Sequence, residues 1–306
     1  MNLYQRIMYI TISLTTACAI ITANYVIGDI FIPIESNAKT NTFINDFNDN
    51  NETLLKNIFP YETVDYQLSV PDNMTYTNSE FQQFKGTYLE ASTTPYPTSY
   101  LKETLFAGDS LTYHLGYSSN QPLHNYDVVA QGGLSVYDYA TYNKNIMYNQ
   151  SPESKTSTQF KTSIQWISEL KPDIIYIMLG TNGIGTSTTI SSYIKSYEIL
   201  LNKIENASPN SEIVICAITP VNNNTIGNYK FSMTVSELNT KIMHYNMSLL
   251  ETAKKRGYYF LNGAEIFYDA NGMLLNEYAS ADGLHWSNKG RSRYIDYVLA
   301  HPVPGF

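Results

Sequence analysis

The sequence predicts an α/β fold over residues 101–306: a three-layer α/β/α sandwich with about five parallel strands. Three observations predict it. Short apolar runs recur along this region, longer segments between them repeat their apolar residues at helical spacing, and the two kinds of segment alternate. Short runs that are apolar throughout are typical of strands covered on both faces. Alternating strands and helices form a parallel sheet with helices on both sides.

Five apolar runs are expected to form the strands of this sheet. They are 104–107, 127–130, 173–179, 213–218 and 258–261. Ligands of open parallel sheets bind at the carboxyl ends of the strands. The loops after these strands are therefore where a functional site is expected.

Helical spacing of apolar residues predicts helices between the strands. The ranges are 157–170, 190–204 and 235–255, with a last helix that begins near Ser287. Lys254, Lys255 and Arg256 precede Gly257, and cations followed by glycine are typical of a helix end. Ser287 is a favoured N-cap residue.

Residues 1–34 are expected to be a signal anchor or a signal peptide. Arg6 precedes a mostly apolar stretch, 7–23, which continues less cleanly to residue 34. The positive-inside rule favours an uncleaved anchor with the rest of the chain outside the membrane. The residues 17–19 form an Ala-x-Ala pattern that a signal peptidase can cut, so a secreted protein stays open. An ordinary core helix is less favoured, because the polar stretch that follows offers it nothing to pack against.

Residues 35–100 are expected to form a polar stalk with a partly ordered collar. They are rich in Asn, Thr, Ser, Tyr and Pro, which are typical of turns and linkers. The domain at 101–306 would thus be tethered to a cell membrane from outside, or secreted if the N-terminal segment is cleaved.

Composition and charge exclude some classes of partner. The formal net charge is −8 and the pI is about 5.1, so the chain has no basic surface to neutralise phosphates, and nucleic acid is not expected as a partner. The cysteines, Cys18 and Cys216, lie in apolar segments and are expected to be buried thiols without a disulfide. No metal site and no cofactor are expected.

A candidate nucleophile follows the first predicted strand. The loop reads Gly108-Asp109-Ser110-Leu111, in which a small turn residue is followed by a serine that opens a helix. A helix N-terminus supplies free amide donors and partial positive charge beside the hydroxyl. Taken alone, the same pattern also fits a serine that only caps the helix.

Two further loops carry polar residues at the same edge of the sheet. Asn182 follows the third strand and either forms a turn or donates its amide to an oxyanion. Asp282 and His285 lie three residues apart just before the last helix. In one loop, the carboxylate can hold one imidazole nitrogen while the other faces a nucleophile. An Asp-x-x-His pair also occurs in ordinary loops and in metal sites, but no other His or Cys cluster supports a metal.

Together, these loops resemble the SGNH hydrolase family, the GDSL esterases. Three of its motif blocks are matched by residues 108–111, 180–182 and 282–285. The resemblance covers roughly residues 102–300 and implies the flavodoxin-like SGNH fold. It also implies Ser110 as nucleophile, His285 as general base and Asp282 as the acid that orients it. The sequence around Ser110 lacks the Gly-x-Ser-x-Gly pattern of the α/β-hydrolase fold.

The resemblance further implies an oxyanion hole, in which one donor stays open. The amide of Ser110 and the side chain of Asn182 are two of its donors. The loop after the second strand departs from the family pattern, because Val136 takes the position of a second glycine when Gly133 is aligned with the first. The remaining backbone donor is therefore Val136 or Gly133.

The function expected from these features is that of an exported serine esterase acting on small acyl esters such as acetyl, with a small molecule or a glycan as substrate. A glycan O-acetyltransferase on the same fold is an alternative, and a catalytically silent cell-surface binding module is another. His114 follows Ser110 on the same helix and either lines the cleft or has a structural or solvent-facing role. Tyr113, Tyr137 and Trp286 flank the motifs and could stack on a sugar ring.

Overall fold

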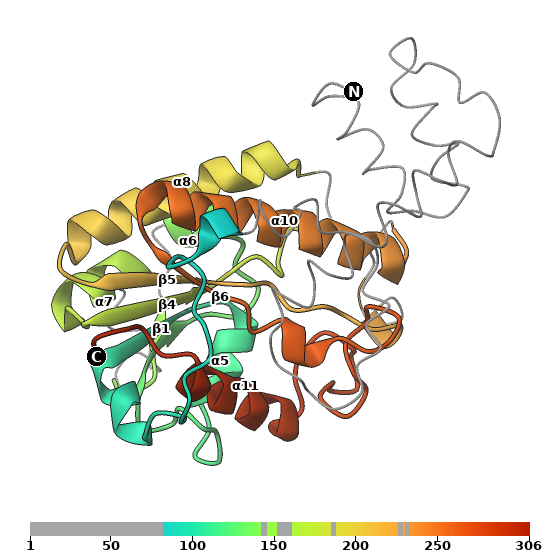
Figure 1. Ribbon diagram of the computed structural model, residues 1–306, viewed down its shortest axis with the longest axis horizontal. Coiled ribbons are helices and arrows are strands. Elements are labelled where there is room, and N and C mark those ends of the chain that lie inside the picture. Colours follow the sequence, from blue (N-terminus) through green and yellow to red (C-terminus); the bar gives the residue numbers. More distant parts are fainter. Residues whose placement is uncertain (1–81, 142–145, 152–160, 185–187, 226–228, 230–232) are drawn as a thin grey trace, which may run out of the picture. The chain divides into compact units, whose positions relative to one another are not determined.

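The computed structural model describes residues 82–141, 146–151, 161–184, 188–225, 229 and 233–306 (Figure 1). The chain divides into two units, and the larger, Gly86–Tyr268 with Met273–Phe306, holds the whole sheet. The predicted membrane segment at 1–34 and most of the stalk lie outside the described residues. Among the residues that are described, no helix has the length and apolar character needed to cross a bilayer.

The larger unit contains one six-stranded sheet. Its strands are β1 (Thr104–Gly108), β2 (Asp127–Ala130), β3 (Met147–Tyr148), β4 (Ile174–Met178), β5 (Glu212–Cys216) and β6 (Tyr259–Leu261), in the spatial order β3-β2-β1-β4-β5-β6. β3 pairs antiparallel with β2, and all other neighbours are parallel. The five predicted parallel strands are confirmed. The sixth, β3, was not predicted, because it is only two residues long and both are half-exposed.

Helices cover both faces of the sheet, so the three-layer architecture is confirmed. Figure 1 shows α8 (Ile190–Ala207) and α10 (Val235–Arg256) on one face, and α5 (Ser110–Gly116) and α11 (Asn288–Ala300) on the other. Two shorter helices, α6 (Val136–Thr141) and α7 (Ser163–Leu170), pack against α8. Three short 3-10 segments are η2 (Gln82–Phe84), η3 (Thr98–Glu103) and η5 (Glu265–Phe267).

Local sequence explains where these elements begin and end. Every residue of β1 and of β4 is buried, as the apolar runs predicted. α7 begins at Ser163 because the hydroxyl of Thr162 accepts from the amide of Gln165 in a capping box. α10 begins with a similar capping box and ends at Arg256, and its C-cap Gly257 has the left-handed φ of 73° that is typical of this position.

The strand order brings three loops to one place. The parallel strands alone run β2-β1-β4-β5-β6, so the chain leaves β1 first to one side and then to the other, and ligands bind at such a switch point. Gly108 is in register with Ala130 of β2 and with Met178 of β4, so the three strands end at the same level. The loops that carry Ser110 and Asn182 therefore meet at the carboxyl edge of the sheet.

The last part of the predicted collar packs on this domain. Tyr88 forms a parallel bridge with Phe260 in β6. The amide of Ser92 donates to the carbonyl of Ala300 at 2.8 Å, at the end of α11. Residues 86–100 thus hydrogen-bond to two elements of the α/β domain.

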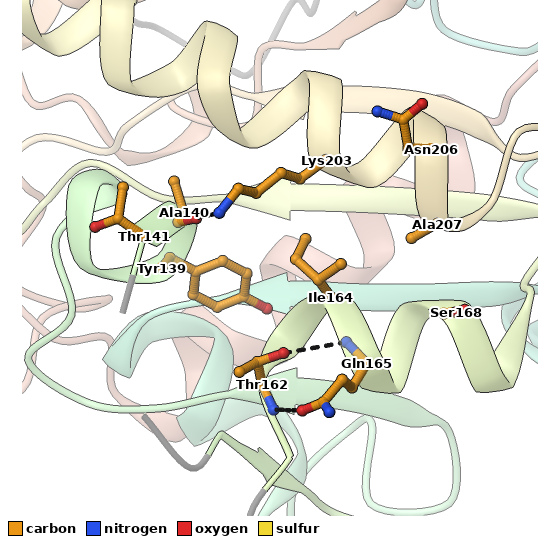
Figure 2. A pocket seen from close by; sticks show the side chains of 10 residues that line it. All are labelled: Tyr139, Ala140, Thr141, Thr162, Ile164, Gln165, Ser168, Lys203, Asn206 and Ala207. Carbon is orange, nitrogen blue, oxygen red and sulfur yellow. Dashed lines mark hydrogen bonds between the residues drawn. The ribbon is translucent and has the colours of Figure 1, made fainter. Parts of the chain in front are cut away.

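A hollow of about 510 Å³ lies among α6, α7 and α8 (Figure 2). It is lined by Tyr139, Ile164 and Lys203, among others. The Lys203 ammonium, the cation in this lining, already donates to the carbonyl of Ala140. None of the predicted site residues lines this hollow.

Candidate active site

Ser110 is held at the carboxyl end of β1 by the two residues that precede it, Gly108 and Asp109. A Cβ on Gly108 would lie 2.0 Å from Oγ1 of Thr112 and 2.3 Å from the carbonyl oxygen of Met178, so only glycine fits between α5 and β4. Asp109 is the N-cap of α5, and its carboxylate accepts from the amide of Leu111 at 3.1 Å. Ser110 therefore begins the helix directly at the edge of the sheet.

The Asp282 carboxylate builds the loop that also carries His285. Its Oδ1 accepts from the hydroxyl of Ser280 at 2.6 Å and from the amides of Leu284 and His285, each at 3.0 Å. Gly283 lies between them with a φ of 73°, a conformation that favours glycine. The turn thus fixes the direction of the imidazole relative to the carboxylate.

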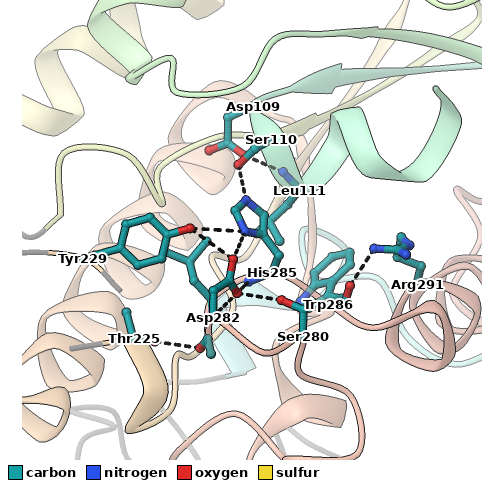
Figure 3. A network of polar contacts seen from close by, with 12 residues as sticks. Asp109, Ser110, Leu111, Thr225, Tyr229, Ser280, Asp282, His285, Trp286 and Arg291 are labelled. Carbon is teal, nitrogen blue, oxygen red and sulfur yellow. Dashed lines mark hydrogen bonds and ion pairs between the residues drawn. The ribbon is translucent and has the colours of Figure 1, made fainter. Parts of the chain in front are cut away.

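The fold brings Ser110, His285 and Asp282 into one chain of hydrogen bonds (Figure 3). Nε2 of His285 lies 2.8 Å from Oγ of Ser110, and Nδ1 lies 2.6 Å from Oδ2 of Asp282. A hydroxyl within hydrogen-bonding distance of an imidazole, which a carboxylate orients from behind, can be deprotonated as it attacks an electrophile. This arrangement is able to perform nucleophilic catalysis.

The electrostatics of the pair favour a charged carboxylate. Burial acts to raise the pKa of Asp282, but hydrogen bonds from His285 and Ser280 and from two backbone amides outweigh it and hold that pKa well below its usual range. The side chains of His285 and Asp282 are 19% and 27% exposed. The carboxylate is thus ionised at neutral pH, while the site stays open to small molecules from solvent.

Asn182 lies beside Asp109 at the same edge. Its Nδ2 donates to Oδ2 of Asp109 at 3.3 Å. Asp109 is buried, and burial raises its pKa to about 6 against the opposing hydrogen bond from Leu111 and the field of His285. An amide nitrogen carries two hydrogens, so the bond to Asp109 leaves one of them to donate elsewhere. The carboxylate also keeps the amide oxygen of Asn182 turned away from itself.

The loop after β2 places Gly132 near Ser110, whereas the sequence indicated Val136 or Gly133 as the backbone donor. A Cβ on Gly132 would lie 3.7 Å from Cβ of Ser110. Gly133 has a φ of 75°, and its missing Cβ would point into open space. Val136 is the first residue of α6, and its side chain is buried. Gly132 is therefore a third candidate for the backbone donor beside Val136 and Gly133.

One aromatic side chain expected to contact a sugar cannot do so. Trp286 is 1% exposed and stacks on Phe267 with ring centroids 4.8 Å apart, so it supports the Asp282–His285 loop from inside the core. That expectation was wrong, because the same aromatic surface that fits a sugar also fits the core. Tyr137 is 52% exposed, and Tyr113 stacks on Tyr117 at 4.1 Å.

His114 lies beside His285 and is also exposed to solvent, so the structure does not choose between its expected placements. Its ring meets that of His285 edge to face, with centroids 5.1 Å apart. Burial, followed by the positive fields of His285 and Arg291, lowers the pKa of His114 from its usual value. His114 is therefore a neutral neighbour of His285 at pH 7.

Sequence reasoning missed Ser280 and Tyr229. Ser280 lies two residues before Asp282, and a Ser-x-Asp turn was a signal that could have revealed it. The hydroxyl of Tyr229 donates to Oδ2 of Asp282 at 3.1 Å and lies 3.4 Å from Nδ1 of His285. Tyr229 is far from both in the sequence, so no local pattern points to it.

Comparisons with known proteins agree with this picture. The model of the GDSL-like lipase/acylhydrolase family matches residues 106–293. A search of curated protein sequences found no match.

Several solved structures are similar to the chain. A protein described as a putative platelet activating factor from Streptococcus pneumonia is 17% identical, with 86% of this chain and 98% of that chain covered and a TM-score of 0.45. A GDSL-like lipase from Bacteroides thetaiotaomicron is 14% identical, with coverages of 67% and 87% and a TM-score of 0.46. A carbohydrate esterase family 3 protein from Talaromyces cellulolyticus is 19% identical, with coverages of 64% and 93% and a TM-score of 0.40.

Proposed function

Because the chain belongs to the GDSL-like lipase/acylhydrolase family and is an ester-bond hydrolase, we propose that it is an exported serine esterase that removes small acyl groups, such as acetyl, from carbohydrate or other small alcohols. The observation that carries the proposal is the 2.8 Å approach of His285 Nε2 to Ser110 Oγ. It joins a hydroxyl and a base from opposite ends of the domain, as nucleophilic catalysis requires.

In the proposed reaction, Ser110 Oγ attacks the ester carbonyl while His285 Nε2 takes its proton. The tetrahedral intermediate collapses when His285 returns that proton to the leaving alcohol. Water then attacks the acyl-serine with the same base and releases the carboxylic acid. Asp282 holds Nδ1 and stabilises the imidazolium that forms in both steps.

The oxyanion is held, in this proposal, by three donors. They are the amide of Ser110 in the first turn of α5, the free hydrogen of the Asn182 side chain and one amide of the loop after β2. Gly132 is the best supported of the three loop candidates, because it lies against Ser110. Loss of one such donor typically costs about 3 kcal/mol of transition-state stabilisation.

Export and the carbohydrate substrate rest on the N-terminal sequence. Arg6 followed by an apolar stretch and then by a polar stalk fits a domain tethered outside a cell membrane. That placement makes an acylated polysaccharide a fitting substrate class for this proposal. Labelling of Ser110 in intact cells by a membrane-impermeant serine-reactive probe tests this placement, and labelling only after lysis would contradict it.

The esterase proposal is tested by a chain-length series of p-nitrophenyl esters and by acetate release from acetylated glycans. We expect acetyl esters to be cleaved fastest, and Ser110→Ala to lose at least about a thousandfold in kcat. Undiminished turnover in Ser110→Ala would remove the mechanism.

Two other outcomes would identify the alternatives. Acetylation of an added glycan by an acetyl donor, without release of acetate, would favour the transferase. Absence of turnover on every ester would favour the binding module.

A further inference from the structure

A tyrosine from outside the sequence motifs contacts the acid–base pair. The hydroxyl of Tyr229 lies 3.1 Å from Oδ2 of Asp282, the same oxygen that accepts from His285 Nδ1 (Figure 3). We propose that Tyr229 is a positioning residue of the esterase: it shares Asp282 Oδ2 with His285 and so limits the negative charge that the carboxylate presents to the imidazole. This inference rests on the proposed function of Ser110, His285 and Asp282.

The backbone that carries Tyr229 is fastened to the Asp282–His285 loop. The amide of Tyr229 donates to the carbonyl of Thr225 at 2.8 Å, and the hydroxyl of Thr225 donates to the carbonyl of Gly283 at 2.7 Å. The amide of Asn222 donates to that same carbonyl at 2.9 Å. The two loops approach so closely here that a Cβ on Gly283 would lie 2.2 Å from Oδ1 of Asn222. The position of Tyr229 is thus set relative to Asp282 by several bonds.

The direction of the hydrogen bond follows from the charges. Burial and the charge of Asp282 raise the pKa of Tyr229 to about 12, so its phenol is protonated and donates. Oδ1 of Asp282 already accepts from Ser280, Leu284 and the amide of His285. Oδ2 is therefore the oxygen for which Tyr229 and the His285 ring are joint donors.

Sharing this oxygen has a consequence for the base. A donor on Oδ2 delocalises the charge of the carboxylate and so weakens its attraction for an imidazolium at His285. Among the described residues, Asp109 and His114 also interact electrostatically with His285, and Arg291 acts on His114. None of these is altered by a change at Tyr229, so a shift in pH dependence can be assigned to the hydroxyl.

The test is Tyr229→Phe, which keeps the ring and removes the hydroxyl. We expect kcat/KM on p-nitrophenyl acetate to fall about tenfold, mainly in kcat, because Asp282 loses a donor that fixes its position and, through it, the direction of the His285 ring toward Ser110. We also expect the acidic limb of the kcat/KM–pH profile, which reports protonation of the free enzyme's base, to move to higher pH. A residue that only packs against the loop would lower the rate without moving this limb.

A double-mutant cycle sharpens the test. If Tyr229 acts through the charge of Asp282, then adding Tyr229→Phe to Asp282→Asn should change the residual rate by less than about twofold. An equal loss in both backgrounds overturns the proposal, and so does an unmoved acidic limb in the single variant.

A matched control is available in Tyr258, another half-buried tyrosine whose hydroxyl donates to a carboxylate, that of Glu205, away from the site. Tyr258→Phe should leave both the rate and the pH profile unchanged. Failure of the two proposals is distinguishable: Ser110→Ala with full activity removes the esterase mechanism itself. An inactive Ser110→Ala beside a wild-type-like Tyr229→Phe removes only the role of Tyr229.

Discussion

Asp282 in the candidate active site and Glu265 in the core offer a comparison of two carboxyl groups with the same kinds of neighbour. Asp282 lies beside Tyr229 and His285. Glu265, in η5, lies beside Tyr88 and Tyr297, and the ring of Tyr297 stacks on His301 at 3.8 Å. Carboxyl, phenol and imidazole thus occur together twice in one domain.

At pH 7 the Glu265 carboxyl group is neutral and that of Asp282 is negatively charged, because their burial and their hydrogen-bond donors differ. Glu265 is 6% exposed, and burial raises its pKa to about 8 although Tyr297 and Tyr88 act against it. Asp282 is less buried and accepts five hydrogen bonds, which hold its pKa well below the usual range. Donor number and solvent, more than the identity of the neighbours, decide which carboxyl group carries charge at pH 7.

The largest expected effect comes from the same chemical change made in both places. Asp282→Asn should lower kcat by about 10³- to 10⁴-fold, because the amide turns a hydrogen toward His285 Nδ1 and forces the tautomer whose Nε2 is protonated. Glu265→Gln should keep nearly full activity at pH 7, since it replaces a neutral acid by a neutral amide. Steady-state rates on p-nitrophenyl acetate, with circular dichroism to check the fold, measure both.

Comparable losses in the two variants would contradict the comparison. A loss confined to Glu265→Gln would reverse it, because the buried group would then be the one that supplies charge to the reaction. The pair also separates chemistry from folding, since both variants remove one potential negative charge from the domain.

The sequence predicted some residues of the candidate active site and not others. Ser110, Asp282 and His285 were found because each lies in a short motif that follows a strand or precedes a helix. Tyr229 was missed because only the fold joins it to Asp282. Gly132 and Gly133 are indistinguishable in sequence, and the conformation of their loop alone decides which one meets Ser110.

The fold was more predictable than the site. β4 was expected at 173–179 and observed at Ile174–Met178, because an unbroken apolar run leaves little choice when both faces are covered. Glu265, in contrast, is a lone charge between two apolar residues, Ala264 and Ile266. Its burial depends on how η5 packs, which no local pattern encodes.

The second prediction concerns stability against pH. The native state keeps the proton of Glu265 up to about pH 8, whereas the unfolded chain releases it near the ordinary pKa of 4.5. The native state therefore binds more protons between these values, and wild-type stability falls as pH rises through this window. Relative to wild type, Glu265→Gln should gain at most about 4 kcal/mol between pH 5 and pH 8, as urea denaturation measures.

Groups that titrate equally in both proteins do not contribute to the difference in stability between Glu265→Gln and wild type. Burial lowers the pKa of His301 to about 4, which makes both proteins lose stability as pH falls below the ordinary histidine value of 6.5. Glu90→Gln, at an exposed carboxylate, is the control for loss of surface charge. A difference between Glu265→Gln and wild type that stays constant from pH 5 to pH 8 would contradict a neutral Glu265.

The smallest effect is expected at Asp109, which is buried like Glu265 but hydrogen-bonded like Asp282. Burial raises its pKa to about 6, so the native state holds its proton between about pH 4 and pH 6 while the unfolded chain does not, and wild-type stability falls through that window. Asparagine caps a helix equally well. Asp109→Asn should therefore gain about 2 kcal/mol over wild type from pH 4 to pH 6 and nothing further above it, with exposed Asp173→Asn as control. A flat difference would mean that the donors Leu111 and Asn182 outweigh burial, which would group Asp109 with Asp282.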